Sequence, residues 1–553
     1  MSSTNTDKLR LQLSGLRRDF AEDESVLHER AAQMLGVDPS EIAELEILKR
    51  SLDARHRPTF MYNVEVALER AQALGALPAG AQLAPEPGSL APQRFEVKKR
   101  ERVVVIGAGP AGLFCAHRLA ESGVETILLD RGQPVEIRGK HVSALMHRGE
   151  LDLDSNICFG EGGAGTWSDG KLYTRVNDVR VRHVLETVVR LGGPAEILVA
   201  AKPHLGTDRL VALCKAFRAK LIEQGCTVRF GAFVRDFDVE RSVGGDRVRA
   251  VILRDGERIE ADRFVLAVGH SARETYRWLA EHKVAMEAKP FAVGYRVEHR
   301  QELVNEIQYG RYAGEAQLPS ADYRLAVNFG KGEEHRGVYS FCMCPGGQVV
   351  PSHTLAEGVC VNGMSHASRR GHWANSALVV SIKPKDFAGF GDIEGLNDYG
   401  GLLAGMAFQD EAERRAYKLG GGGFIAPAQR LTDFKLGRKS KDLRKTTYKP
   451  GIAAADVAEC YPEFVTNALR KALDGFERKM RGFVSEDALL IGVETRTSAP
   501  VQITRDDDSL QSRSLKGFYP CGEGAGYGGG IVSAAIDGLR VAERILNELS
   551  VLS

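Results

Sequence analysis

Three glycines at a fixed spacing follow a short apolar segment near residue 100. Residues 102–106 read RVVVI, as a buried parallel strand does, and GAGPAG follows at once. In such a turn the first glycine permits a tight bend, the second lets the backbone approach a pyrophosphate, and the third lets the next helix pack against the strand. The helix N-terminus offers free N–H groups and a positive dipole end. The pattern predicts a dinucleotide-binding turn made by Gly107, Gly109, Pro110, Ala111 and Gly112.

An acidic residue stands where the ribose of a dinucleotide is expected. The second strand of the unit, ETILLD, ends at Asp130, which is placed to accept hydrogen bonds from ribose hydroxyls. We include the next residue, Arg131, among the expected cofactor contacts. A GxGxxG turn between a strand and a helix, with the acid at this distance, is specific for a dinucleotide, but it does not separate FAD from NAD.

Three further segments favour FAD. The first is a second glycine-dense loop at 159–172, FGEGGAGTWSDGKL. The second is RVRAVILRDGERIEADRFVLAVGH, with a hairpin turn at Asp255-Gly256 and an apolar strand that ends near Gly269. The third, near the C-terminus, is GFYPCGEGAGYGGGIVSAAIDGLRVAERIL, a strand, a glycine loop and a helix. This layout is usual in flavoproteins of the two-dinucleotide-fold type, so one FAD is expected.

The chain resembles the bacterial and plastid family of FAD-dependent dehydrogenase-like proteins, often labelled NAD(FAD)-utilising dehydrogenases. The resemblance covers nearly the whole chain and rests on FGEGGAGTWSDGKL, KPHLGTDRL, LAVGHSARET, KPFAVGYRVEH, VYSFCMCPGG, GVETRTSAPV and YPCGEGAGYGGGIVSAAIDG. It implies that the C-terminal loop closes over the flavin, with Glu523 on the ribityl chain and Val234 on the adenine. The cofactor contacts expected beyond the first turn are Gly162, Gly163, Ala164, Gly165, Thr166, Lys171, Val234, Gly269, Gly522, Glu523, Gly528, Gly529, Gly530 and Ile531.

Four side chains are candidates for catalysis. Lys171 either pairs with a phosphate or the flavin, or is a solvated lysine. Cys342 and Cys344 share one face of a predicted strand, as a redox pair, as thiolates near the flavin, or as the commoner buried cysteines. Arg496 follows the apolar strand ALLIGVE and makes either a substrate-anion contact or a structural ion pair.

The elements that position these residues are expected to form an α/β protein. We expect an FAD-binding Rossmann-like domain of the two-dinucleotide-fold type, an inserted mixed α+β substrate domain and a small N-terminal α+β module. The expected boundaries are 1–73 for the module, 74–98 for a linker, 99–284 for the first part of the FAD-binding domain, 285–488 for the inserted domain and 489–553 for the C-terminal part of the FAD-binding domain.

Local patterns predict the N-terminal module. Apolar alternation around Leu11 and Val64 predicts two half-buried strands. Asp38-Pro39 supplies an N-cap followed by proline at the first helical position, which predicts a helix over 41–52. The following segment, ALGALPAGAQLAPEPGSLAPQ, has no periodicity and predicts the linker.

Composition limits the partners. Lys and Arg number 74 against 73 acidic residues, so nucleic acid is an unexpected partner. No stretch reaches about 18 apolar residues and the first residues have no apolar leader, so we expect a cytoplasmic protein without a membrane partner. The nine cysteines include no CxxC pair, which predicts reduced thiols and no metal site. The basic segment 430–450, with eight basic side chains, either docks an anionic ligand or an electron-transfer partner, or is a solvated loop.

The leading hypothesis is a redox enzyme in which FAD exchanges hydride or electrons with a small substrate. Neither of the later GxGxxG strings, at Gly160 and Gly524, precedes a second strand with a terminal acid, so NAD(P)H is expected only as a transient donor. The alternatives are an RNA-modifying flavoprotein, suggested by 430–450 and the separate N-terminal module, and a flavin-dependent binding or sensor protein without catalysis.

Overall fold

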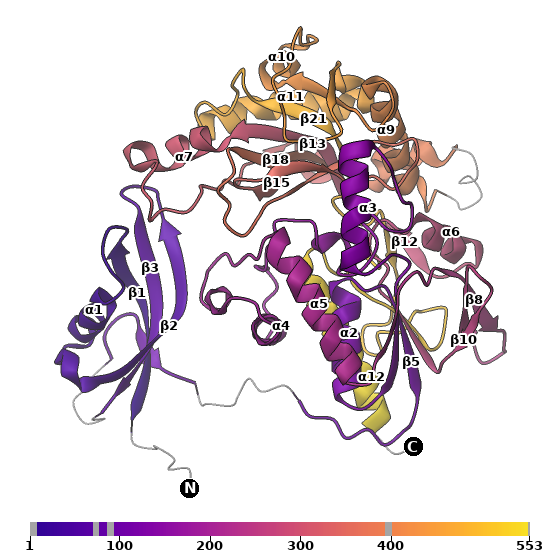
Figure 1. The fold of residues 1–553 in the computed structure, drawn as a ribbon, viewed down its shortest axis with the longest axis horizontal. Coiled ribbons are helices and arrows are strands. Elements are labelled where there is room, and N and C mark those ends of the chain that lie inside the picture. Colours follow the sequence, from indigo (N-terminus) through magenta and orange to yellow (C-terminus); the bar gives the residue numbers. More distant parts are fainter. Residues whose placement is uncertain (1–7, 70–76, 86–92, 393–400, 551–553) are drawn as a thin grey trace.

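The computed structural model consists of three units, and the second domain is inserted between two parts of the cofactor-binding domain (Figure 1). The structure describes residues 8–69, 77–85, 93–392 and 401–550. In Figure 1 the N-terminal module stands on the left, the cofactor-binding domain fills the lower right, and the second domain lies above it. Helix α3 (Val135–Arg148) runs between the two larger units and packs against strand β16 (Gln348–Pro351).

The N-terminal module is a four-stranded antiparallel sheet with one helix against it. The strand order is β2-β3-β1-β4. The elements are β1 (Leu9–Asp19), α1 (Val26–Leu35), β2 (Ile42–Asp53), β3 (Thr59–Leu68) and β4 (Ala81–Leu83). Leu11, Val64 and Val66 of the sheet are buried together with Leu27 and Ala31 of the helix. The module therefore has a hydrophobic core of its own.

Two local predictions for this region are wrong. The segment 41–52 forms strand β2 and not a helix. Asp38 and Glu41 do form a capping box, but it starts only a short 3₁₀ turn, and the residues after it pair with β3. The strand pairing outweighs the local helix signal. Strand β4 also lies inside the segment predicted as an irregular linker, whereas the predicted boundary at residue 73 lies outside the described residues.

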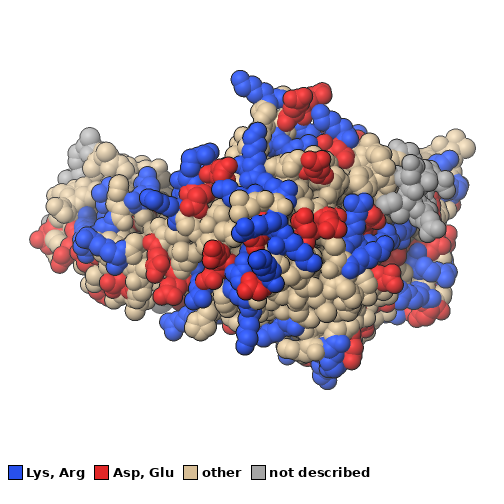
Figure 2. Space-filling model, turned by 90° about the horizontal axis from the view of Figure 1, so that it is seen from above, with Lys and Arg blue, Asp and Glu red and all other residues tan. Residues whose placement is uncertain are grey.

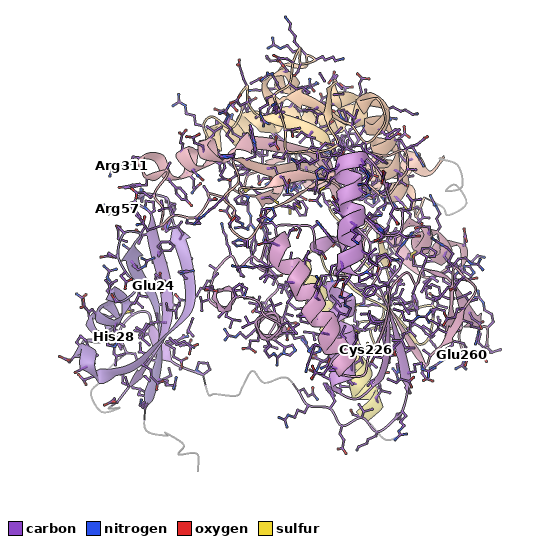
Figure 3. All side chains as sticks on the ribbon, viewed as in Figure 1. Glu24, His28, Arg57, Cys226, Glu260 and Arg311 are labelled. Atoms are coloured by element: carbon purple, nitrogen blue, oxygen red, sulfur yellow. The ribbon has the colours of Figure 1, made fainter. Side chains whose placement is uncertain are left out.

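The module contacts the body of the protein through the edge of β2. The backbone N–H of Arg50 donates to the carbonyl oxygen of Val199 at 2.7 Å, and the N–H of Ala201 donates to the carbonyl oxygen of Arg50 at 2.8 Å. At the far end, the guanidinium of Arg57, which is labelled in Figure 3, lies 5.9 Å from the ring of Tyr312. These contacts seat the module against both larger domains.

The cofactor-binding domain has a five-stranded parallel sheet in the order β23-β11-β5-β6-β7. Its strands are β5 (Arg102–Ile106), β6 (Glu125–Leu129), β7 (Thr227–Arg229), β11 (Arg263–Leu266) and β23 (Phe518–Pro520). Helices α2 (Pro110–Glu121), α5 (Thr207–Glu223) and α12 (Ile531–Ser550) share its main core. The predicted strand, turn, helix and second strand are all present. The last strand, β23, completes the sheet, and the last helix, α12, packs in its core.

A small antiparallel sheet precedes the return of the chain to the parallel sheet. Its strands are β8 (Val234–Glu240), β9 (Arg247–Leu253) and β10 (Arg258–Glu260), in the order β10-β9-β8. The predicted hairpin at Asp255-Gly256 joins the last two strands, and Gly256 has a φ of 92°. After β11, helix α6 (Arg273–Glu281) leads toward the second domain.

The second domain is built on a seven-stranded sheet in the order β14-β15-β18-β13-β21-β19-β20. Its strands are β13 (Phe291–Arg300), β14 (Ala326–Phe329), β15 (Arg336–Cys344), β18 (Trp373–Ile382), β19 (Ala426–Arg430), β20 (Ile452–Ala454) and β21 (Leu489–Glu494). Helices α7 (Gln301–Tyr309), α9 (Ala404–Gly420), α10 (Leu431–Leu436) and α11 (Glu463–Lys479) accompany it, and β16 pairs with β17 (Val361–Met364).

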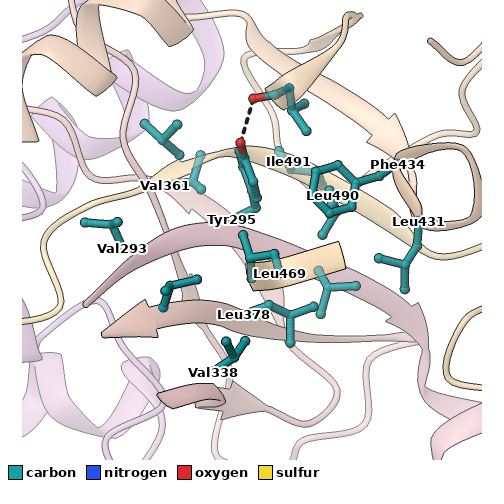
Figure 4. Packing of buried hydrophobic residues seen from close by; sticks show 14 of the residues in the cluster. Val293, Tyr295, Val338, Val361, Leu378, Leu431, Phe434, Leu469, Leu490 and Ile491 are labelled. Carbon is teal, nitrogen blue, oxygen red and sulfur yellow. Dashed lines mark hydrogen bonds between the residues drawn. The ribbon is translucent and has the colours of Figure 1, made fainter. Parts of the chain in front are cut away.

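The core of this domain packs around the central strands (Figure 4). Val293 and Tyr295 of β13 are buried beside Leu378 of β18 and Leu469 of α11. The Tyr295 hydroxyl donates to the carbonyl oxygen of Val457 at 2.6 Å, so this polar group is paired in an apolar core.

Strand β21 lies in the second sheet and not in the cofactor-binding domain, for which the sequence predicts residues 489–553. It pairs with β13 on one side and with β19 on the other. The chain returns to the cofactor-binding domain after this strand, by way of β22 (Val501–Ile503), which pairs with β12 (Met286–Ala288). An apolar strand such as LLIGVE fits the middle of either sheet, so the sequence alone does not distinguish them.

Candidate cofactor and substrate site

The first glycine turn has the close contacts that a phosphate-binding turn requires. Gly107 has a φ of 107°, and a Cβ there would lie 2.3 Å from the carbonyl oxygen of Ala267 at the end of β11. A Cβ on Gly112 would lie 1.8 Å from the carbonyl oxygen of Gly107. Around Gly109 a Cβ would meet only Gly163, at 3.8 Å, so the backbone at the start of α2 is open to a ligand.

Asp130 supports this turn from within the protein. Its carboxylate accepts hydrogen bonds from the backbone N–H groups of Ala108, at 2.7 Å, and Gly132, at 2.8 Å. The carboxyl group is buried at the end of β6. Each carboxylate oxygen can accept further hydrogen bonds, so the ribose contact stays a prediction beside this structural role.

The second glycine loop is held by a buried arginine that no sequence motif marks. Arg138 of α3 is fully buried and its guanidinium lies 4.5 Å from the ring of Trp167. It donates to backbone carbonyl oxygens of the loop, namely those of Asn156, Ile157, Glu161 and Gly163. Gly163 in turn lies against Gly109, because a Cβ on Gly163 would be 3.0 Å from the Cα of Gly109. The two glycine loops therefore meet.

The C-terminal glycine loop reaches the same place. A Cβ on Gly524 would lie 2.5 Å from the carbonyl oxygen of Gly269, at the end of β11. The buried hydroxyl of Tyr276 lies 2.8 Å from the carbonyl oxygen of Gly524 and 3.2 Å from that of Gly269, and so connects the two segments. Asp537 of α12 accepts from the N–H of Gly522 at 2.7 Å and is paired with Arg505.

Glu523 has the electrostatics of a ligand-facing acid. Burial raises its pKa to about 7, although the positive charge of Lys289 opposes the shift. The Lys289 ammonium donates to the Ser498 hydroxyl at 2.9 Å. An acid in such surroundings is stabilised in its charged form by any ligand hydroxyl that donates to it. The predicted ribityl contact of Glu523 fits this arrangement.

The residues before α12 leave room for a flat ligand. Gly529 is exposed, and a Cβ built on it would have no atom within 4 Å. Gly530 has a φ of 130°, which favours glycine. Both precede Ile531, where the 20-residue helix α12 begins, so its free N–H groups and positive dipole end face this space. The predicted contacts from Gly528 to Ile531 are thus available to a flavin.

A polar layer from the second domain closes on the end of β11. Arg496 donates to both carboxylate oxygens of Glu413 on α9, at 2.8 and 2.6 Å. The same guanidinium donates to the hydroxyl of Ser271 at 3.2 Å and to that of Thr354 at 2.6 Å. Of the two alternatives for Arg496, the structure shows the ion pair. Burial raises the pKa of Glu413, but the charge of Arg496 outweighs it and leaves that pKa lowered.

His270 lies at the junction of the two domains. Its Nδ1 is 2.9 Å from the Ser271 hydroxyl. Burial and the positive charges of Arg496 and Arg273 lower the pKa of His270 to about 3. This imidazole is therefore neutral at pH 7, and one ring nitrogen can donate a hydrogen bond while the other accepts one.

Lys171 faces the second domain. Its ammonium lies 3.0 Å from the carboxylate of Asp169, which also pairs with Arg369. Burial lowers the pKa of Lys171, but the charges of Cys344, Cys342 and Asp169 outweigh it and raise that pKa. Lys171 is thus paired. Three of the four catalytic candidates, Lys171, Cys342 and Cys344, lie in one cluster, whereas Arg496 lies in the polar layer that contacts Ser271.

The remaining predicted residues lie at the margins. Arg131 pairs with Asp154 at 2.6 Å and lies over the rings of Phe159 and Phe233. Val234 begins β8 and pairs with Leu253, so its predicted adenine contact stays a prediction. The other predicted contacts, Gly162, Ala164, Gly165 and Thr166, belong to the second glycine loop.

The basic segment 430–450 is folded onto the second domain. Arg430 pairs with Asp442, and Arg444 pairs with the buried carboxylate of Glu298 and lies 3.8 Å from the ring of Trp373. Figure 2 shows acidic side chains among the basic ones on the face seen from above. A partner at this segment would meet its exposed lysines, which are Lys439, Lys441, Lys445 and Lys449.

Together, the parallel sheet, the phosphate turn and the C-terminal loop define a Rossmann-type FAD-binding flavoprotein. The chain matches the model of an FAD binding domain over residues 102–144, that of an FAD-dependent protein C-terminal domain over 290–497, and a domain of unknown function over 8–69. It is 39% identical to a protein of Clostridium beijerinckii described as uncharacterized, over 97% of this chain and 99% of that protein. The chain belongs to this family of FAD-dependent proteins.

Solved structures show weaker similarity. The structure of CtdE in complex with FAD is 12% identical, with a TM-score of 0.30, over 82% of this chain and 87% of that chain. The glycerol-3-phosphate dehydrogenase from Bacillus halodurans complexed with FAD is 10% identical, with a TM-score of 0.33, over 82% of this chain and 65% of that chain. Similarities at this level are too low to bear on activity.

Membrane-spanning helices and metal clusters are both absent from the described ranges. No helix there is both long and apolar enough to cross a membrane. No group of three or more His, Cys, Asp or Glu side chains in the same ranges is placed to hold a metal ion.

Proposed function

We propose that this protein is an FAD-dependent oxidoreductase of the dehydrogenase-like kind, which transfers hydride or electrons between FAD and a small substrate. One observation carries the proposal: a polar side chain of the second domain contacts the cofactor-binding domain close to the C-terminal glycine loop. Gly524 of that loop lies against Gly269, and Ser271, two residues later, accepts a hydrogen bond from Arg496. A substrate placed between these groups would lie at the end of the parallel sheet, where ligands of such folds bind.

Each group has a role that follows from its chemistry. Bound FAD supplies the redox step, because its ring takes up or gives up hydride. The N–H groups at the start of α12 stabilise negative charge beside the ring. Arg496 fixes the hydroxyls of Ser271 and Thr354, which orient a polar substrate group, and neutral His270 can donate or accept a hydrogen bond.

NAD(P)H is proposed as a transient donor. In the described part of the chain, the parallel strands lie in a single sheet, which carries the phosphate turn after β5. The exception is the parallel pair β19 and β20 of the second domain. A nicotinamide cofactor would therefore bind at the junction between the domains and leave after reducing the flavin.

The test begins with the purified protein. We expect a yellow protein whose denatured supernatant contains FAD and not FMN, and whose flavin is bleached by NADH or NADPH in an anaerobic titration. A colourless protein that FAD does not reconstitute would contradict the assignment. A yellow protein that no donor reduces would instead favour a sensor. Salt-dependent binding of tRNA would favour the RNA-modifying alternative.

A further inference from the structure

The last residues of β15 depart from regular strand geometry at a pair of cysteines. Cys342 has a φ of 48°, in the left-handed region that residues other than glycine rarely adopt. The pairing of β15 with β18 shifts register between Phe341 and Cys344, so an irregularity lies at this point. A strained backbone conformation at a chemically reactive side chain is a reason to look for function there.

The two cysteines form one polar unit. The Cys344 thiol donates to the carbonyl oxygen of Cys342 at 3.3 Å, so its side chain folds back along the strand. Arg296 of β13 donates to the same carbonyl oxygen at 2.9 Å and lies 3.6 Å from the Cys344 sulfur. Gly363 of β17 makes this possible, because a Cβ there would lie 2.1 Å from the Arg296 guanidinium. The strands thus hold a guanidinium against the Cys342 carbonyl oxygen and the Cys344 sulfur.

Charges around the pair favour one thiolate. Interaction between the two thiol groups lowers the pKa of Cys342 to about 6 against the effect of burial, and the charges of Lys171 and Arg296 add to the shift. The carboxylate of Glu494 opposes it. The same interaction and burial raise the pKa of Cys344, so the pair holds one proton at neutral pH. Cys342 is also partly exposed, whereas Cys344 is buried.

We propose that Cys342 and Cys344 are a redox-active dithiol whose substrates are small disulfides. The Cys342 thiolate attacks one sulfur of a disulfide R–S–S–R, which forms a Cys342–S–S–R bond and releases one RS⁻. Cys344 then attacks the Cys342 sulfur, its proton passes to the second leaving thiolate, and a Cys342–Cys344 disulfide remains. The two cysteines lose two electrons, and the disulfide gains them as one thiolate and one thiol.

The position of the pair connects it with the cofactor domain. Lys171, which supports the thiolate, belongs to the second glycine loop, and that loop meets the phosphate turn through Gly163. Return of two electrons to the oxidised pair from reduced FAD rests on the proposed function. The exchange with a disulfide does not, because it needs only the two thiols.

The exchange is tested on the purified flavin-loaded protein with 5,5′-dithiobis(2-nitrobenzoate), an aromatic disulfide. We expect two equivalents of nitrothiobenzoate from this pair per wild-type chain, and peptide mass mapping should find a Cys342–Cys344 disulfide. The Cys344→Ser variant should stop at a mixed disulfide on Cys342 after one equivalent. The Cys342→Ser variant should release none from this pair. Cys158→Ser, which removes the other partly exposed thiol, is the matched control.

A second measurement follows alkylation of Cys342 by iodoacetamide against pH. At pH 7 a thiol of pKa about 6 is about nine-tenths ionised, against a few per cent for a thiol of ordinary pKa, so the alkylation rate of Cys342 should already be close to its high-pH plateau. Lys171→Gln should move the midpoint of the Cys342 rate to higher pH.

Two results would overturn the proposal. One is a wild-type protein in which the alkylation rate of Cys342 still rises about tenfold or more between pH 7 and pH 9. The other is a mixed disulfide at Cys342 that never releases its second thiol. Where a variant fails to fold, mass mapping of the wild type still decides. Repeating the exchange after removal of FAD separates this proposal from the proposed function: loss of flavin reduction by NAD(P)H with intact exchange counts against the latter alone.

Discussion

Glu523 provides the sharpest test of where the flavin lies. Burial raises the pKa of Glu523 to about 7, so in the free protein about half of the molecules carry its charge at pH 7 and about one-tenth at pH 6. If ribityl hydroxyls donate to this carboxylate, FAD binds the ionised form better and binding releases a proton. The affinity for FAD should therefore fall as the pH drops through 7, and rise to a plateau above it.

The size of the effect follows from the ionised fraction. Between pH 8 and pH 6 the charged fraction falls about tenfold, and because the neutral form binds about tenfold more weakly, the apparent Kd of wild-type apoprotein for FAD should rise about fivefold. Glu523→Gln keeps the shape of the side chain without its charge. It should bind FAD about tenfold more weakly at pH 8, because a hydrogen bond to a charged group is stronger by about 1.4 kcal/mol, and it should show no slope between pH 6 and pH 8.

A second variant checks the cause of the shift. Lys289 lowers the pKa of Glu523 by its charge, so Lys289→Met should move the midpoint of the FAD affinity curve to higher pH. The measurement is a titration of apoprotein with FAD, followed by flavin fluorescence at each pH. Glu494 also has a pKa raised to about 7 by burial, but it is paired with Arg296 in the second domain. If Glu523→Gln keeps the wild-type slope and affinity, the C-terminal loop does not contact the ribityl chain.

Three further predictions concern the site and its supports. Gly529→Val should leave the circular dichroism spectrum unchanged but weaken FAD binding at least tenfold, because the added side chain would occupy the open space in which the flavin is predicted to lie. Gly389→Val, at an equally open position, should leave FAD affinity unchanged. If the Gly529 variant and the wild type bind FAD equally well, the flavin does not approach this loop closely. Arg138→Met should lower the denaturant midpoint, since unpaired buried carbonyls cost about 1–3 kcal/mol each, and an unchanged midpoint would contradict that role. Deletion of 1–85 should leave a soluble, FAD-loaded protein, because the module has its own core; loss of all such protein would show otherwise.

The sequence predicts those parts of the site in which one residue type is required by local geometry. Gly107 and Gly112 stand where a Cβ would collide with backbone, so their spacing by itself indicates the turn. Arg138, Tyr276 and Glu413 carry no such signal, because what defines each is a partner far away in the sequence. An arginine inside VEIRGKHVSAL has no local pattern that marks it as the support of a loop.

The errors in the predicted fold have the same origin. The capping signal at Asp38 is real, but the residues after it pair with β3, and pairing with a distant strand overrides the local helix preference. Strand β21 is predicted in the wrong sheet, because a run of apolar residues shows that a strand is buried and not which neighbours bury it. In both cases the tertiary partner decides the structure, and local residue patterns do not encode that partner.

The separation of the two halves of the cofactor-binding domain also governs when the protein can first hold its cofactor. At a synthesis rate of about 5–20 residues per second, the ribosome needs roughly 20–80 s to travel the approximately 400 residues from the phosphate turn to β23 and α12. Once made, β11 has no neighbour on its outer side until β23 follows, by which time the strands of the second domain are complete. Chains that end before α12 lack the loop that is predicted to face the flavin, so the yellow colour would then report on finished chains, and the emerging edge of β11 is where a chaperone would be needed.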